Sequence, residues 1–299
     1  MTDSIVYPPA ADTAADTAAD TEAELAELLT ADNEPPRVTL VARPGRARRD
    51  ELPGHPTPYS PYGSVLEGGR PQAVKAVAEG RAGVQDEGSQ LVAVALARAD
   101  LAPGPDRLWL DLCAGPGGKS ALLAALGAER GATLLATERA PHRARLVAQA
   151  LRGAGGVAGV VVADGRRPPL RAGSVDRVLV DAPCTGLGAL RRRPESRWRR
   201  KPDDLLELVL LQRSLLASAI DLVRPGGAVL YATCSPVLAE TSGVVTSVLD
   251  TRSDVVLDDA AALLPDVPDC AGSLPGTVQL WPHRHGTDAM FMALLRRTG

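Results

Sequence analysis

The sequence lacks several features, and their absence excludes some classes of protein. The 299 residues contain no apolar run approaching the roughly 20 residues that span a bilayer, only 3% aromatic residues, and four cysteines. Since the N-terminus also lacks a basic segment followed by an apolar one, we expect no membrane anchor, no secretory signal and a cytoplasmic location. No CxxC pair and no Cys/His cluster occurs, so we expect neither a disulfide framework nor a metal site. The cysteines are Cys113, Cys184, Cys234 and Cys270.

The acidic residues are concentrated near the N-terminus. Residues 1–34 contain nine Asp and Glu and no Lys or Arg, whereas the net charge of the whole chain is -3. The remainder is therefore modestly basic, which suits an anionic partner such as RNA, DNA or a phosphate ligand. Asp12, Asp16 and Asp20 would place like charges on one face of a helix, so we expect residues 1–34 to form a disordered acidic tail.

Strand-like and helix-like segments alternate along the rest of the chain. Helical periodicity separates most of the buried-strand patterns, which occupy residues 108–113, 133–138, 159–164, 176–183 and 227–235. This alternation predicts an α/β fold with a doubly wound, mostly parallel sheet, which a C-terminal hairpin makes mixed. Residues 35–75, which contain one strand-like run and many Pro, Gly and Tyr, indicate a small irregular subdomain.

A glycine-rich turn follows the first of these strands. The sequence DLCAGPGGKS (111–120) leads from strand to helix, where glycines let the backbone approach a ligand closely. Glu138 ends the next strand 20 residues after Gly118, a spacing that places a carboxylate near ribose hydroxyls in nucleotide-binding folds. A purely structural turn is the alternative. A phosphate loop is disfavoured because Cys113 replaces its first glycine, and a dinucleotide fingerprint because Ser120 replaces its third.

Two acids and two cysteines follow the ends of later strands. Asp164 and Asp181 lie at the edge where ligands bind in open α/β sheets, although each is also suited to capping a helix or turn. Cys184 follows Asp181 in the sequence DAPC, and Pro183 fixes the backbone before it. Cys234 occupies the corresponding end of the next strand. Free cysteines are more often small buried hydrophobes than nucleophiles, but two at neighbouring strand ends favour a chemical role.

A basic stretch follows Cys184. The sequence RRRPESRWRRK (191–201) carries seven basic residues and one acid around a tryptophan. Arginine pairs with phosphates or stacks on bases, and tryptophan adds a stacking face, so the composition is typical of a groove for single-stranded nucleic acid. A solvated surface loop is the alternative. The residues expected to contact RNA are Arg191, Arg192, Arg193, Arg197, Trp198, Arg199 and Arg200.

Five motifs, in order along residues 37–297, resemble the RNA cytosine-5 methyltransferases of the Nol/Nop/Sun family, most closely the bacterial 16S ribosomal RNA enzymes of the Sun/Fmu (RsmB-like) kind. The motifs are VQDEGSQLVA, DLCAGPGGKS, DAPCTGLGALRRRPESRWRR, YATCSPVLAE and HRHGTDAMFMALLRR. The resemblance implies a Rossmann-like methyltransferase domain with a seven-stranded sheet at residues 81–299, after a small α+β subdomain of RNA-binding type at 35–80. The sequence departs from the family in lacking a recognisable all-helical N-terminal domain and in having Ala-Gly where the family has Ala-Ala.

The resemblance also implies roles for the site residues. It makes S-adenosyl-L-methionine the cofactor, ribosomal RNA the partner, Cys234 the nucleophile and Cys184 the residue that assists product release. We expect Asp181 to hydrogen-bond the cytosine ring. The residues expected to bind the cofactor are Cys113, Ala114, Gly115, Pro116, Gly117, Gly118, Lys119, Glu138, Asp164 and Asp181.

Other functions remain open at this point. Carbon 5 of cytosine is a weak nucleophile, and a thiolate that adds at carbon 6 makes it reactive. The same chemistry on DNA would make Cys184 the nucleophile by family analogy. A non-catalytic RNA-binding or assembly factor is a further alternative, which the intact cysteines and strand-end acids disfavour. The sequence assigns no role to Cys270 or His283 and leaves the target nucleotide and oligomeric state open.

Overall fold

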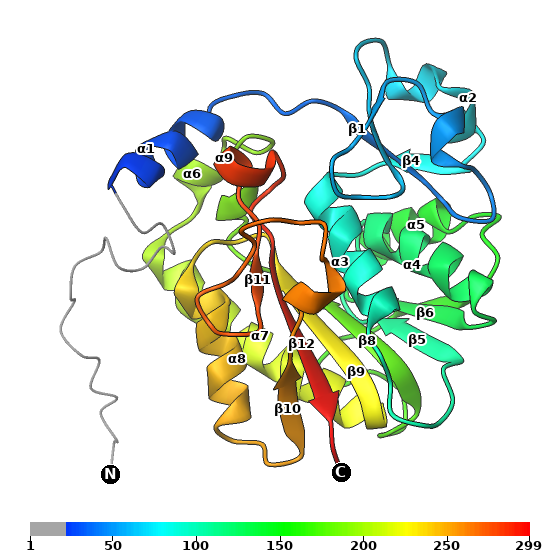
Figure 1. The fold of residues 1–299 in the computed structure, drawn as a ribbon. Coiled ribbons are helices and arrows are strands. Elements are labelled where there is room, and N and C mark those ends of the chain that lie inside the picture. The colour runs from blue at the N-terminus through cyan, green and yellow to red at the C-terminus, as the bar shows by residue number, and fades with distance from the viewer. Residues whose placement is uncertain (1–21) are drawn as a thin grey trace.

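The computed structural model describes residues 22–299 and contains two sheets (Figure 1). The larger sheet has the order β10-β12-β9-β8-β5-β6-β7, with β11 paired to β12 beside this path. Its strands are β5 (Leu108–Asp111), β6 (Thr133–Glu138), β7 (Val157–Val162), β8 (Val175–Asp181), β9 (Val223–Thr233), β10 (Val255–Asp258), β11 (Val278–Gln279) and β12 (Phe291–Arg297). Strands β5 to β9 pair in parallel, and β12 is antiparallel to its neighbours. The expected C-terminal hairpin is confirmed, since β11 pairs antiparallel with β12, and the sheet has eight strands instead of the expected seven because β10 also pairs with β12.

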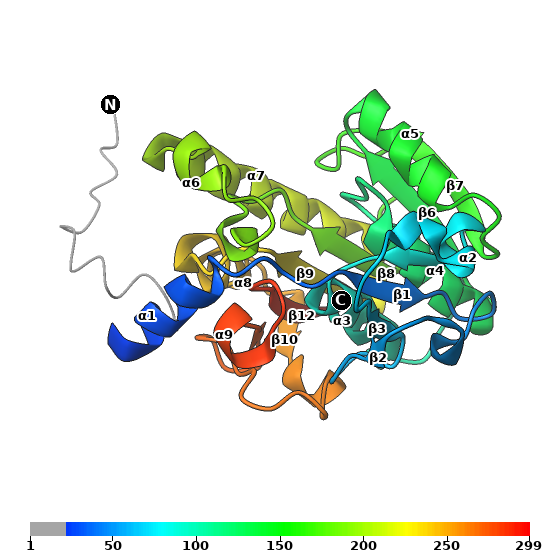
Figure 2. The ribbon, with the colours of Figure 1, turned by 90° about the horizontal axis from the view of Figure 1, so that it is seen from above.

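Helices cover both faces of the larger sheet, as Figures 1 and 2 show. On one face lie α3 (Glu87–Arg98), α4 (Gly118–Glu129) and α5 (Pro141–Ala150), and on the other lie α7 (Pro202–Leu222) and α8 (Ser242–Leu249). The predicted doubly wound α/β fold is therefore confirmed. Strand β8 is buried along most of its length, as expected for a central parallel strand that is covered on both faces.

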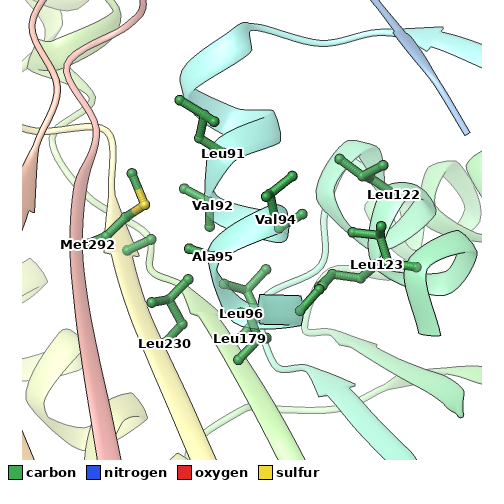
Figure 3. Close-up of a cluster of buried hydrophobic side chains, with 14 of the residues drawn as sticks. Leu91, Val92, Val94, Ala95, Leu96, Leu122, Leu123, Leu179, Leu230 and Met292 are labelled. Carbon is green, nitrogen blue, oxygen red and sulfur yellow. The ribbon is translucent and has the colours of Figure 1, made fainter. Parts of the chain in front are cut away.

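The core lies between the sheet and the helices on each face. Helix α3 is buried along almost its whole length, because it packs against both α4 and the central strands. Figure 3 shows this cluster, in which α3 lies between Leu122 of α4 on one side and Leu230 of β9 and Met292 of β12 on the other. The Asp86 carboxylate accepts the main-chain N–H of Gly88 at 2.9 Å and so caps the start of α3.

The smaller sheet is antiparallel, with the order β2-β3-β1-β4. Its strands are β1 (Thr39–Ala42), β2 (His55–Pro56), β3 (Gly63–Val65) and β4 (Ala82–Val84), and α2 (Lys75–Ala78) packs beside β4. It has a small core of its own around Leu40. Because β4 pairs with β1, this sheet extends beyond the subdomain boundary expected after residue 80.

Short helices complete the structure. They are α1 (Glu22–Ala31), α6 (Ser196–Arg199), α9 (Pro282–His285) and five 3₁₀ helices: η2 (Arg49–Glu51), η3 (Pro71–Ala73), η4 (Leu187–Ala189), η5 (Leu238–Glu240) and η6 (Ala261–Leu263). None of the helices found between residues 22 and 299 is long and apolar enough to cross a membrane.

Helix α1 corrects the prediction that all of residues 1–34 are disordered. It packs beside α9, where Leu28 is buried against Trp281. Glu24 forms an ion pair with Arg284 of α9, which offsets part of the acidic charge, and its Oε1 atom lies 3.1 Å from Nε2 of His283. The charge pattern did not reveal these partners, because they lie more than 250 residues away in the chain. Residues 1–21, with the repeated aspartates, lie outside the described residues.

The packing in Figure 3 generates a stability prediction. Leu230 is fully buried in β9, so Leu230→Ala should lower the free energy of unfolding by about 2–5 kcal/mol, measured by urea denaturation. Val256 on edge strand β10 is 44% exposed, and Val256→Ala should change this free energy by no more than about 0.5 kcal/mol. Equal losses in the two variants would contradict the described core.

Candidate functional site

A cleft of about 620 Å³ opens at the carboxyl ends of the parallel strands, where the strand order changes direction between β5 and β8. It brings together residues that are far apart in the sequence. Of the expected site residues, those that line the cleft are Cys113, Gly115, Pro116, Lys119, Glu138, Asp164, Asp181, Cys184, Cys234, Arg192, Arg193 and Arg200. Those that do not line it are Ala114, Gly117, Gly118, Arg191, Arg197, Trp198 and Arg199.

The glycine turn between β5 and α4 is packed too closely for side chains at two positions. Gly117 has a φ of +110°, and a Cβ there would lie 2.7 Å from Cβ of Ala150. A Cβ on Gly115 would lie 2.2 Å from Oε2 of Glu138. The turn is therefore pressed against both α5 and the end of β6.

Glu138 is held by several donors at the end of β6. It is nearly buried and accepts main-chain N–H groups from Gly115 at 3.1 Å and Ala140 at 2.8 Å. The Nε atom of Arg143 lies 3.6 Å from Oε2 of Glu138, and Nη2 of Arg143 donates to the carbonyl of Gly115. Arg143 lines the cleft but was not among the expected site residues, because its place in α5 has no special sequence signal.

Asp164 lies at the rim of the cleft, just past the end of β7. Its carboxylate pairs with Arg166, with Oδ2 and Nη2 2.6 Å apart. The hydrogen bonds from Arg166 lower the pKa of Asp164 to about 2. Asp164 is therefore negatively charged near neutral pH.

Lys119 links the glycine turn to the end of β8. Its Nζ atom donates to Oδ2 of Asp181 at 2.9 Å and to Oγ of Ser89 at 3.2 Å. Burial alone would lower the pKa of Lys119, but the Asp181 carboxylate outweighs burial and raises it. The ammonium group therefore stays charged and holds one oxygen of Asp181 in place.

Cys184 and Cys234 face each other across the cleft, with their Sγ atoms 3.4 Å apart. The hydrogen bond from Cys184 lowers the pKa of Cys234 against the opposing effect of burial, and Lys119 acts in the same direction as the hydrogen bond. The same hydrogen bond, together with burial, raises the pKa of Cys184 well above the ordinary value of a thiol. The two thiols are therefore unequal, and Cys234 is the one that forms a thiolate first.

The first two arginines of the basic stretch form ion pairs within the protein. Arg191 donates to Asp86 and to Asp288, each at 2.9 Å, and its side chain is only 9% exposed. The expectation that Arg191 contacts nucleic acid is therefore corrected, because two carboxylates already bind its buried guanidinium group. Arg192 pairs with the same two aspartates but is more exposed and lines the cleft.

The rest of the basic stretch lies at the surface beside the cleft. Arg200 donates to the carbonyls of Thr185 at 2.9 Å and Cys184 at 3.2 Å, so it supports the loop that carries a thiol. Arg197 donates to the carbonyl of Asp32. Trp198 of α6 is 77% exposed, which leaves its ring free to stack.

Sequence reasoning also missed Asp86 and Asp288, although each lies within a motif used for the resemblance. The two residues without an assigned role lie in ordinary surroundings: Cys270 is buried in the core and His283 pairs with Glu24. Within residues 22–299, no group of His, Cys, Asp and Glu side chains is arranged to hold a metal ion.

The chain is similar to several known proteins. It is 55% identical over 278 residues to the Mycobacterium tuberculosis protein Rv1407, whose name describes it as a methyltransferase, covering 92% of this chain and 60% of that protein. It is 36% identical over 228 residues to ribosomal RNA small subunit methyltransferase B of Salmonella newport, covering 75% of this chain and 51% of that one. The chain therefore spans only about half to three fifths of the length of these relatives.

Solved structures and a protein-family model agree with this similarity. The crystal structure of PH0851 matches with a TM-score of 0.81 and 29% identity over 93% of this chain and 63% of that one. NSun6 from Pyrococcus horikoshii, at 19% identity, matches with a TM-score of 0.78 over 94% of this chain and 96% of that one, and so shares the fold. The family model described as 16S rRNA methyltransferase RsmB/F matches residues 98–296. Because that match covers more than half of the chain, the chain belongs to the RsmB/F family of 16S rRNA methyltransferases.

Proposed function

We propose that this chain methylates carbon 5 of a cytosine in RNA through a covalent adduct with Cys234. The observation that carries the proposal is the contact at 3.4 Å between two unequal thiols, beside Asp181 in a cleft of ligand-binding size. The family description and the name of the Salmonella relative favour small-subunit ribosomal RNA as the substrate.

The cofactor is S-adenosyl-L-methionine, which supplies an electrophilic methyl group. The donor set of the cleft fits it: the oriented Glu138 carboxylate lies at the strand end where ribose hydroxyls are bound in related folds. The turn at residues 113–119 presents close-packed backbone to the same space, and Asp164 and Asp181 line it. These residues would hold the cofactor.

Cys234 and Cys184 divide the chemistry. The Cys234 thiolate adds to carbon 6 of the cytosine, which displaces an electron pair toward carbon 5. That pair would bond to the methyl carbon supplied by S-adenosyl-L-methionine, and the electrons of the broken carbon–sulfur bond would stay on the cofactor sulfur. Carbon 5 then loses its proton, and the electron pair of that C–H bond expels the Cys234 thiolate from carbon 6. Once Cys234 is bonded to carbon 6, the largest of the effects that raise the pKa of Cys184 is removed while burial and the Glu240 charge remain, and Cys184 assists in removing this proton.

Polar and basic groups around the thiols position the base. Lys119 holds one oxygen of Asp181, and the carboxylate hydrogen-bonds the ring edge of the cytosine. A paired base cannot reach a cleft, so the target cytosine must be unpaired or flipped out. Arg193 and Arg200 bind phosphates at the rim, and Trp198 stacks on a neighbouring base. Arg37, which is exposed just before β1 of the small sheet, extends this RNA contact.

The different roles of the two cysteines predict that their substitutions have opposite effects on the covalent adduct. With labelled S-adenosylmethionine and ribosomal RNA, Cys184→Ser should accumulate a covalent protein–RNA adduct on a denaturing gel, because the adduct cannot resolve. Cys234→Ser should form no adduct and transfer no methyl group. Cys270→Ser is the matched control and should behave as wild type, since Cys270 does not line the cleft. An adduct in Cys234→Ser, or methyl transfer to DNA instead of RNA, would overturn the assignment.

The contact between the two thiols predicts the pH at which Cys234 becomes reactive. Iodoacetamide should label Cys234 with a midpoint below the ordinary pKa of a thiol, because the Cys184 hydrogen bond stabilises the thiolate. Cys184→Ala removes this donor and should move the midpoint to higher pH, so that labelling at pH 7 slows. Cys184→Ser keeps an O–H donor and should stay closer to wild type. Mass spectrometry of the labelled peptide measures the midpoint, and an unchanged midpoint in Cys184→Ala would contradict the description.

The close packing of the glycine turn predicts how a substitution there changes the affinity for the cofactor. Gly115→Ala places a methyl group against the Glu138 carboxylate and should weaken S-adenosylmethionine binding by at least about tenfold in calorimetry, a loss of roughly 1.4 kcal/mol. Gly68→Ala is the control, because no atom lies within 4 Å of a Cβ there. Absence of binding to the wild-type protein would favour a non-catalytic RNA-binding factor.

A further inference from the structure

One buried carboxylate lies behind the two thiols. Glu240 ends η5, between β9 and α8, and is fully buried. Its Oε1 atom accepts the main-chain N–H of Thr185 at 2.8 Å and the side-chain amide of Gln212 at 3.0 Å. Its Oε2 atom accepts the hydroxyls of Thr185 at 2.5 Å and of Ser235 at 2.6 Å. Four donors from three separate segments therefore converge on this side chain.

These donors lie next to the thiols in the sequence. Thr185 directly follows Cys184, and Ser235 directly follows Cys234. We propose that Glu240 is a positioning residue, which joins the two cysteine loops, sets their thiol contact and makes the two cysteines unequal in reactivity. This inference rests on the proposed function, in which the two cysteines have different roles.

The geometry fixes the Cys184 loop on both sides. Gln212 donates to the carbonyl of Pro183 at 2.9 Å as well as to Glu240, so the residue before Cys184 is held by a partner of the same carboxylate. Hydrogen bonds to an ionised acceptor are stronger than neutral ones, and a network in the protein interior is costly to leave unpaired. Small shifts of either loop are therefore opposed by the whole network.

The charge of Glu240 acts on one thiol. This charge helps to raise the pKa of Cys184, although the Cys234 hydrogen bond and burial raise it more. Its charge is not among the main influences on the pKa of Cys234. The buried carboxylate thus favours the state in which Cys234 is the thiolate and Cys184 keeps its proton. Because it does not line the cleft, Glu240 would act through the two loops and not by touching the RNA.

The test uses Glu240→Gln in the full chain, which keeps the shape of the side chain but removes its charge. Iodoacetamide labelling without RNA or cofactor, read by mass spectrometry, should show a fall in the ratio of Cys234 to Cys184 labelling, because loss of the Glu240 charge makes Cys184 easier to ionise. In methyl transfer, kcat should fall by about a hundredfold with KM for RNA unchanged, as expected when reacting groups lose their alignment.

The matched control is Glu87→Gln. Glu87 is also buried and accepts two main-chain N–H groups, from Tyr59 at 2.7 Å and Ser60 at 2.6 Å, but neither donor belongs to a cysteine loop. This variant should lose stability without changing the labelling ratio, which separates positioning from a general loss of packing. A folded Glu240→Gln variant with the wild-type ratio and kcat would overturn the proposal.

If Glu240→Gln does not fold, two smaller substitutions test whether Glu240 positions the cysteine loops. Thr185→Val and Ser235→Ala each remove one hydroxyl donor and should each lower kcat by about tenfold at unchanged KM, the cost of roughly one hydrogen bond. Wild-type kcat in both would overturn the proposal. The labelling ratio can be measured without catalysis. If the wild-type protein transfers no methyl group, the proposed function is rejected, but the labelling ratio still tests the role of Glu240.

Discussion

The parallel pairing of β8 with β9 determines where the two thiols lie, and the rest of the site is arranged around them. Asp181 is opposite Ala232 in this pairing, and the main-chain N–H of Ala182 donates to the carbonyl of Ala232 at 2.8 Å. The two strands therefore end at the same level, and Cys184 and Cys234 follow within three residues. A slip by one residue would reverse the faces of all side chains on a strand. The buried faces of both strands make such a slip costly.

Segments with a strong local pattern could be predicted from the sequence. Most of the central strands contain an apolar run, the glycine turn marks the start of a helix, and alternation of the two element types implies a doubly wound sheet. The sequence did not reveal β10, because a strand of four residues is too short to show a clear periodicity, whereas β11 belongs to the C-terminal hairpin that was expected. It also did not reveal α1, because the buried contact of Leu28 with Trp281 depends on the folded chain.

The same distinction applies to the site. Glu138, Asp181 and the thiols could be grouped in advance, because parallel strands share one carboxyl edge. The partners of Arg191 could not, since Asp86 and Asp288 lie 105 and 97 residues away from it. A run of arginines has the same composition whether it binds phosphates or buried carboxylates. Glu240 was missed for a similar reason, because an isolated acid between a strand and a helix has no distinctive pattern.

The position of β12 has a consequence for the nascent protein on the ribosome. This strand lies between β9 and β10, although it is made after both, and Asp288 just before it supplies ion pairs to the cleft. Chains are synthesised from the N-terminus at about 5–20 residues per second, so early segments emerge while later ones do not yet exist. Both cysteines therefore leave the ribosome before the wall beside them can form. The cleft is therefore complete only after β12 has been made.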